Sequence, residues 1–121
     1  MASFDFGNGP VPAHKHPNGG GWVADTASVA TTAYVGPNAQ VYGKAQVYGD
    51  AWVYDNALVY DNALVYGNAL VYGNARVYGN AQVCGKARVF GDALVFGKAR
   101  VYGNALVCGH AQVYGNARAS E

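Results

Sequence analysis

The sequence predicts an all-β protein, a single parallel β-helix that occupies residues 22–118. Three observations predict this fold. Valine stands at every sixth position from Val23 to Val113, sixteen times without interruption. Alanine stands at every sixth position from Ala27 to Ala117, again sixteen times. Most repeats also contain Gly-Asn or a similar pair, which favours a change of chain direction. A short period kept over such a length is typical of a repeat architecture.

The repeating unit, Val-Tyr-Gly-Asn-Ala-x, fits a strand and not a helix. Six residues turn an α-helix by about 600°, so the valines would not stay on one side of it. In a strand, side chains alternate between two sides, so Ala-x-Val-Tyr places Ala and Val on one side and x and Tyr on the other. We therefore expect Val and Ala to fill the interior, with x and Tyr outside.

The two residues after each tyrosine position are the expected corners. Residues 37–38 (Pro-Asn), 55–56 and 61–62 (both Asp-Asn) fit a type II turn with the asparagine in the left-handed region. Where lysine or histidine comes second, the preceding residue is glycine, which is free to take the positive φ instead. Residues 25–26 and 31–32 place threonine second, so we expect a less regular first coil.

This pattern resembles the hexapeptide-repeat left-handed β-helix family, which includes many acyltransferases and the gamma-type carbonic anhydrases. Residues 41–46 (Val-Tyr-Gly-Lys-Ala-Gln) and their siblings match the aliphatic and small positions of the family motif, although Tyr replaces Gly at the second position. The resemblance implies a triangular prism with left-handed winding and 18 residues, or three units, per coil. The usual crossover rule would favour the opposite hand, so the expected handedness depends on the resemblance alone. Residues 19–23 (Gly-Gly-Gly-Trp-Val) are also similar to those of short bacterial and phage repeat proteins.

The repeat divides the chain into three parts. Residues 1–21 are expected to form an irregular cap, residues 22–118 the β-helix and residues 119–121 a tail. Sixteen units give about five coils, roughly 25 Å long. Phe4, Phe6 and Val11 could cover the first coil. The last coil has no capping helix in this sequence, so we expect it to expose unpaired backbone, together with Val113 and Ala117, and to favour end-to-end association.

The outward residues are the candidates for function. With 18 residues per coil they fall on three faces, each with an aromatic column beside a column of Leu, Gln and Arg. The favoured interpretation is that the aromatic rings stack and stabilise the solenoid, with the tyrosine hydroxyls in water. A flat apolar face also marks an interface. The best candidate face carries Tyr34, Trp52, Tyr54, Leu70, Tyr72, Phe90 and Leu106. Relatives of the resembled family often form side-by-side trimers, which implies a homo-oligomer.

Residues that carry chemistry are few. Acyltransferases of the resembled family use a histidine and inserted loops, whereas these coils have no insertion and His110 stands at a corner. The aspartates of the repeat also stand at corners, so we expect no catalytic residue and no cofactor. His14 and His16 could bind a metal ion from one side of an extended segment, but a solvated polar cap is favoured. Cys84 and Cys108 fall on different faces and are expected to be free thiols.

Composition limits the partners and the cellular location that we expect. Charged residues make up 12% and the net charge is +1, which argues against nucleic-acid binding. No segment has the length and hydropathy of a membrane span, and the first residues lack a signal peptide, so we expect a cytoplasmic protein or part of a phage-like particle. The leading hypothesis is a non-enzymatic, self-assembling structural module. The alternatives are an acyltransferase-like enzyme and surface recognition of carbohydrate or ice.

Overall fold

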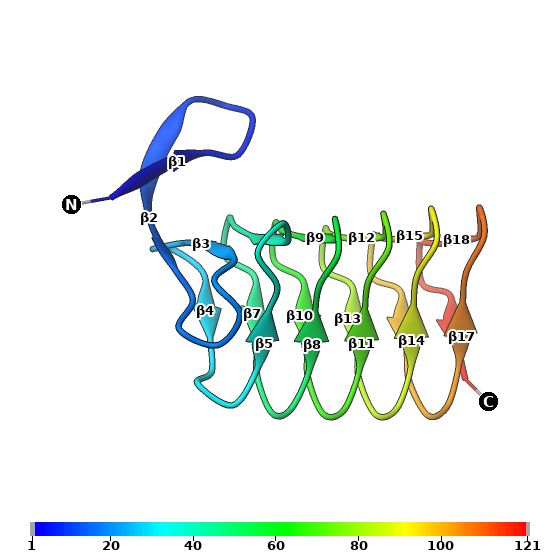
Figure 1. The fold of residues 1–121 in the computed structure, drawn as a ribbon. Helices are drawn as coiled ribbons and strands as arrows, with labels where there is room; N and C mark the ends of the chain where they lie inside the picture. Colours follow the sequence, from blue (N-terminus) through cyan, green and yellow to red (C-terminus); the bar gives the residue numbers. More distant parts are fainter. Residues whose placement is uncertain (1, 121) are drawn as a thin grey trace.

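The protein is an all-β parallel solenoid of about five turns (Figure 1). The computed structural model describes residues 2–120, so Met1 of the expected cap and Glu121 of the expected tail lie outside the described residues. Among the described residues, no helix is long and apolar enough to cross a membrane.

Three sheets form the sides of the prism, and each is called a face here. The first face consists of β3 (Trp22–Ala24), β6 (Gln40–Val41), β9 (Leu58–Val59), β12 (Arg76–Val77), β15 (Leu94–Val95) and β18 (Gln112–Val113), extended by β1 (Ser3–Asp5) and β2 (Pro10–Lys15). The second face consists of β4 (Ser28–Val29), β7 (Gln46–Val47), β10 (Leu64–Val65), β13 (Gln82–Val83), β16 (Arg100–Val101) and β19 (Arg118–Ala119). The third face consists of β5 (Tyr34–Val35), β8 (Trp52–Val53), β11 (Leu70–Val71), β14 (Arg88–Val89) and β17 (Leu106–Val107).

The register between coils is constant. Each parallel strand pair aligns residues 18 apart, as in Leu64 opposite Gln82. The N–H of Tyr42 donates to the carbonyl of Val59 at 3.0 Å, and the same bond recurs from coil to coil. The expected turn of 18 residues is therefore confirmed.

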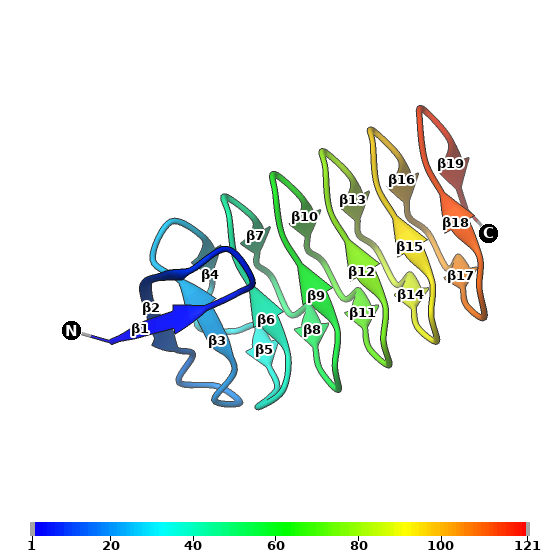
Figure 2. The same ribbon diagram turned by 90° about the horizontal axis from the view of Figure 1, so that it is seen from above.

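The winding is left-handed. In Figure 1 the chain advances from left to right, with the third face in front, the first face on top and the second face behind. Figure 2, seen from above, places the first face toward the viewer and the third and second faces on opposite sides. The path β5, β6, β7 thus runs front, top, back while it moves right, which is left-handed. The right-handed crossover rule describes returns through a packed helix, and here each connection is a short corner.

Valine and alanine fill the interior, as expected. From Ala33 to Val101, every inward Val and Ala side chain is at most 1% exposed. Each buried valine contributes about 1.5–3 kcal/mol before the loss of conformational entropy is subtracted. The core is narrow, but it continues from coil to coil.

The Asp-Asn corners differ from the expected type II turns. Their positive φ lies on the first residue, at 58° for Asp55 and 61° for Asp61, and not on Asn56 or Asn62, whereas Gly43 before Lys44 has a φ of 66°, as expected. The alanine N–H then donates back to the residue before the corner, as in Ala57 to Tyr54 at 3.3 Å. A positive φ at the first central residue alone is the pattern of a type II′ turn. Neither residue of the 37–38 corner has a positive φ.

Contact with the next coil explains why the first corner residue takes the positive φ. The N–H of the second corner residue donates to the carbonyl of the next coil's first corner residue, as in Asn56 to Gly73 at 2.9 Å. A Cβ on Gly43 would lie 2.9 Å from the backbone nitrogen of Asp61, so most first positions accept only glycine. In the less regular first coil, the hydroxyls of Thr26 and Thr32 donate to the carbonyls of Gly43 and Gly49.

The N-terminal segment is an antiparallel hairpin followed by a short covering strap. Strands β1 and β2 pair with each other, and β2 pairs antiparallel with β3. Residues 18–21 cover the edge of β5, because the Val35 N–H donates to the Asn18 carbonyl and the Gly21 N–H to the Val35 carbonyl, both at 3.0 Å. Phe4 and Phe6 do not cover the end of the core. They lie outside and stack on Trp22 and Tyr42.

Candidate functional site

Aromatic rings form stacked columns on the outside of the solenoid. On the first face, adjacent rings lie 4.8–5.4 Å apart with interplanar angles of 11° or less. This spacing follows the distance between neighbouring strands, because every ring occupies the same place in its coil. The column contains Tyr42, Tyr60, Tyr78, Phe96 and Tyr114.

The third face carries two exposed apolar side chains beside a column of stacked rings. Tyr54, Tyr72 and Phe90 stack with centroids 4.9 Å apart, and Trp52 meets Tyr54 edge to face at 6.0 Å. Trp52 is 47% exposed and Leu106 63% exposed. All seven side chains proposed from the sequence for this face come from its five strands or the residues directly after them. We call them the third-face patch: Tyr34, Trp52, Tyr54, Leu70, Tyr72, Phe90 and Leu106.

Two further sequence candidates lie elsewhere. Val113 belongs to β18 of the first face and is half-buried, and Ala117 is an exposed residue before β19. Together with the exposed Ala111 they form the inner surface of the last described coil, separate from the third-face patch.

Few of the outward charged side chains lie close to a side chain of opposite charge. Within residues 2–120, the contacts between a nitrogen base and a carboxylate are His14 with Asp25 at 2.7 Å and His110 with Asp92 at 3.7 Å. The described structure therefore shows no carboxylate within 4.0 Å of an arginine, including Arg88, which lies between Leu70 and Leu106 of the third-face patch. Arg100 lies opposite Arg118 on adjacent strands of the second face.

Four tyrosines of the columns have a raised pKa. Burial raises the pKa of Tyr42, Tyr54 and Tyr60 above 10.0, with a further contribution from the stacked neighbour in the next coil. The hydrogen bond with Cys84, followed by burial, raises the pKa of Tyr66 to about 12.

His14 and His16 do not contact the same group. His14 is exposed and its Nδ1 lies 2.7 Å from Asp25, whereas His16 is 3% exposed and its Nε2 lies 2.8 Å from the carbonyl oxygen of Ala33. Since a carbonyl only accepts, the Nε2 of His16 carries the proton. His14 and His16 thus have different hydrogen-bond partners, and a metal site at these two residues stays a prediction. Within the described part of the chain, no group of three or more His, Cys, Asp or Glu side chains could hold a metal ion.

The remaining chemistry-bearing residues are separate as well. His110 stands at an exposed corner, as its sequence position indicates. Cys84 follows β13 of the second face and Cys108 follows β17 of the third, and both are free thiols. The sequence did not predict that His16 is buried and bonded to the Ala33 carbonyl. Residues 1–21 contain no repeat from which its burial could be inferred.

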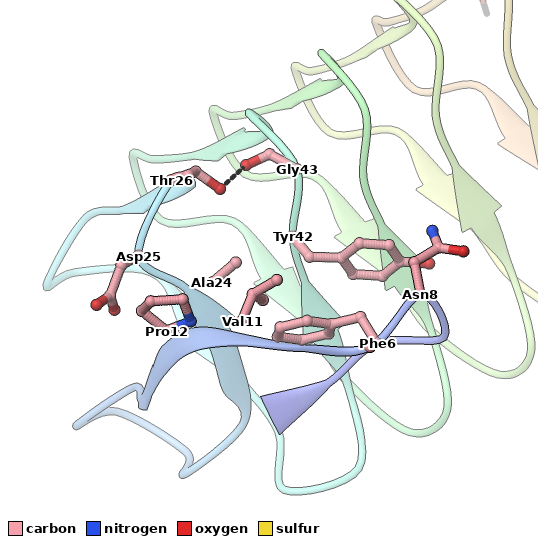
Figure 3. Close-up of a pocket in the computed structure, with 10 residues that line it drawn as sticks. Phe6, Asn8, Val11, Pro12, Ala24, Asp25, Thr26, Tyr42 and Gly43 are labelled. Carbon is pink, nitrogen blue, oxygen red and sulfur yellow. Dashed lines mark hydrogen bonds between the residues drawn. The ribbon is translucent and has the colours of Figure 1, made fainter. Parts of the chain in front are cut away.

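The sequence also gave no sign of a pocket beside the hairpin. It has a volume of about 350 Å³ and lies between the hairpin and the first corners (Figure 3). The hairpin contributes Phe6, Asn8, Gly9, Val11 and Pro12, and the solenoid contributes Ala24, Asp25, Thr26, Tyr42 and Gly43.

Comparison with known proteins gives one similarity. The family described as YdcK Beta solenoid repeat matches residues 45–59, 51–67, 57–71, 63–79 and 69–85. These overlapping matches span residues 45–85, about a third of the chain, and lie within the regular coils. No curated protein and no solved structure matches the chain. The similarity concerns the solenoid repeat, and the likeness to hexapeptide-repeat acyltransferases stays a prediction.

Proposed function

We propose that this chain is a non-enzymatic structural module, a rigid β-solenoid that associates side by side with copies of itself through the third-face patch. The observation that carries the proposal is the exposure of Trp52 and Leu106 on one face, where the outward column is apolar except at Arg88. Exposed apolar patches of this kind mark interaction surfaces. Tryptophan and tyrosine are also the residues that most often anchor protein interfaces.

The stacking supports the proposal because it prepares the patch for binding. Tyr72 stacks between Tyr54 and Phe90, so the rings of this column have little side-chain freedom left to lose on association. The corners are short and the core is filled, which keeps the face flat. A patch that meets its own copy gives a two-fold dimer, and one that meets a neighbouring face gives a closed trimer.

Three leucines allow a matched test. Leu58, Leu64 and Leu70 stand in the same pentapeptide, Asn-Ala-Leu-Val-Tyr, and all three are half-buried outward residues. They differ in their face, which is the first for Leu58, the second for Leu64 and the third for Leu70. Each is replaced by glutamate in the full chain, and circular dichroism checks that the solenoid is retained.

In sedimentation velocity, we expect the unchanged chain to be an oligomer. We expect the Leu70→Glu chain to be a monomer. Leu58→Glu and Leu64→Glu keep the oligomer, because their carboxylates point from other faces. A monomeric unchanged chain at high concentration would overturn the proposal. Dissociation by Val113→Asp with no effect of Leu70→Glu would also overturn it, since the contact would then lie on the last coil.

A further inference from the structure

We propose that the pocket beside the N-terminal hairpin is a binding site for a small uncharged aromatic molecule of one or two rings that carries a hydroxyl or N–H group. This site lies apart from the third-face patch. The corner of Gly43 connects β6 of the first face with β7 of the second, so a two-fold contact between third-face patches leaves the pocket open.

The size of the pocket limits the ligand. Its volume is about 350 Å³, which is at the lower end for small-molecule sites and above the roughly 150 Å³ of a cavity that holds benzene. A molecule of one or two rings therefore fits, whereas a larger ligand would extend into solvent.

Apolar groups form most of the walls. Phe6 and Tyr42 stack with ring centroids 4.8 Å apart, and Val11, Pro12 and Ala24 also line the pocket (Figure 3). Aromatic side chains favour a further aromatic ring in an offset-stacked or edge-to-face arrangement. The walls thus favour a flat aromatic molecule over an aliphatic one of equal volume.

The rim of the pocket is held in place before any ligand binds. The Asp5 carboxylate accepts the N–H groups of Gly7 at 2.7 Å and Gly9 at 3.1 Å, and both glycines have positive φ. This pair of bonds shapes the tip of the hairpin. On the opposite side, the Thr26 hydroxyl donates to the Gly43 carbonyl (Figure 3). A preformed site loses less conformational entropy on binding.

The polar groups of the lining select the charge of the ligand. Asp25 contributes a carboxylate that His14 holds at 2.7 Å, and no lysine or arginine lines the pocket. An anion is therefore disfavoured. The amide of Asn8 is exposed and can exchange a hydrogen bond with a hydroxyl or N–H group. These groups together indicate an uncharged ligand with one polar atom.

The test uses indole as probe and indole-3-carboxylate as its charged counterpart, with amide chemical shifts of the full chain as the readout. We expect saturable shifts with indole that are confined to the pocket residues. Indole-3-carboxylate, which has the same ring system and a negative charge, should bind at least about tenfold more weakly, or about 1.4 kcal/mol.

Two phenylalanines provide the matched variants. Phe4 and Phe6 each stack on a solenoid ring, at 4.9 and 4.8 Å, but only Phe6 lines the pocket. Phe6→Ala should weaken indole binding about tenfold, in line with the loss of one aromatic contact, whereas Phe4→Ala should change it less than about twofold. Val11→Phe keeps the hairpin and fills the pocket, so it should abolish binding.

Several results would overturn the assignment. These are shifts spread along the aromatic columns, equal binding of the carboxylate, equal effects of Phe4→Ala and Phe6→Ala, and binding that survives Val11→Phe. Pocket shifts that appear with rising protein concentration and no probe would assign the pocket to a side chain of a second copy instead.

Discussion

At the scale of single residues, Asp55 and Asp61 show how the corner tolerates a side chain. They are the non-glycine residues with positive φ in the described chain. Each carboxylate accepts the N–H of the glycine one coil further on, at 3.2 Å for Asp55 to Gly73 and 3.1 Å for Asp61 to Gly79. A charge-assisted hydrogen bond of this kind offsets a left-handed conformation that costs roughly 1–2 kcal/mol. The sequence alone suggested that the neighbouring asparagines adopt it.

Tyr66 provides a prediction at the same scale. Its hydrogen bond with Cys84, and then burial, raise its pKa from 10.0 to about 12. The folded chain therefore holds the proton more tightly than the unfolded chain. The associated stability is complete below pH 10.0 and is lost as the pH rises to about 12. Ultraviolet titration of tyrosinate should show a late component that disappears in Tyr66→Phe and moves to lower pH in Cys84→Ala. An unchanged titration curve in Tyr66→Phe would contradict the assignment.

At the scale of elements, each strand depends on its neighbours in other coils. The strands of the coils are mostly two residues long, and such short elements are not stable alone. Their hydrogen-bond partners lie in the coils before and after. The corners that join them are equally dependent, because the first corner residue approaches the backbone of the next coil.

Substitutions of Gly73 and Gly109 can separate two costs to stability, that of a side chain at positive φ and that of close approach to the next coil. Gly73 and Gly109 have φ of 69° and 63°. A Cβ on Gly73 would lie 2.8 Å from the nitrogen of Gly91, whereas one on Gly109 would meet nothing within 4 Å. Gly109→Ala should cost about 1 kcal/mol of unfolding free energy for conformation alone. Gly73→Ala should cost at least about 2 kcal/mol, because backbone must also shift. Urea unfolding measures both, and equal losses would show that close approach does not matter.

At the scale of the whole molecule, the solenoid is a nearly one-dimensional stack. Its interior repeats every unit, since each one contributes one Val and one Ala. Contacts join mainly neighbouring coils, so stability is close to a sum over units and their interfaces. The N-terminal hairpin and residues 18–21 cover edges of the first and third faces, while nothing in the described residues pairs with the N-terminal edge of β4.

Deletions test this architecture. Removal of residues 88–93, one unit, joins Ala87 to Leu94 and keeps every later Val and Ala inward. We expect a folded protein with somewhat lower stability. Removal of residues 88–90 joins Ala87 to Gly91 and breaks the alternation, so we expect loss of cooperative unfolding. Circular dichroism and urea unfolding distinguish the two. If the deletion of 88–93 also unfolds the chain, the outward faces contribute to specifying the fold.

The candidate sites differ in how far they could be predicted. The seven residues of the third-face patch follow from the coil length, and the structure places them on one sheet. The pocket could not be predicted, because it depends on where an antiparallel hairpin of unrepeated sequence lies against the first corners. The separate roles of His14 and His16 depend on the same placement, through Asp25 and the Ala33 carbonyl.

Local periodicity was sufficient for the solenoid, its Val and Ala interior and the assignment of outward residues to faces. These features depend only on alternation along a strand and on a constant coil length, which are written in every unit. The corner conformation, the covering of the N-terminal edges and the pocket came only from the folded chain. They are decided by contacts between segments that are neighbours in space and distant in sequence, such as Asp61 with Gly79 and Phe6 with Tyr42.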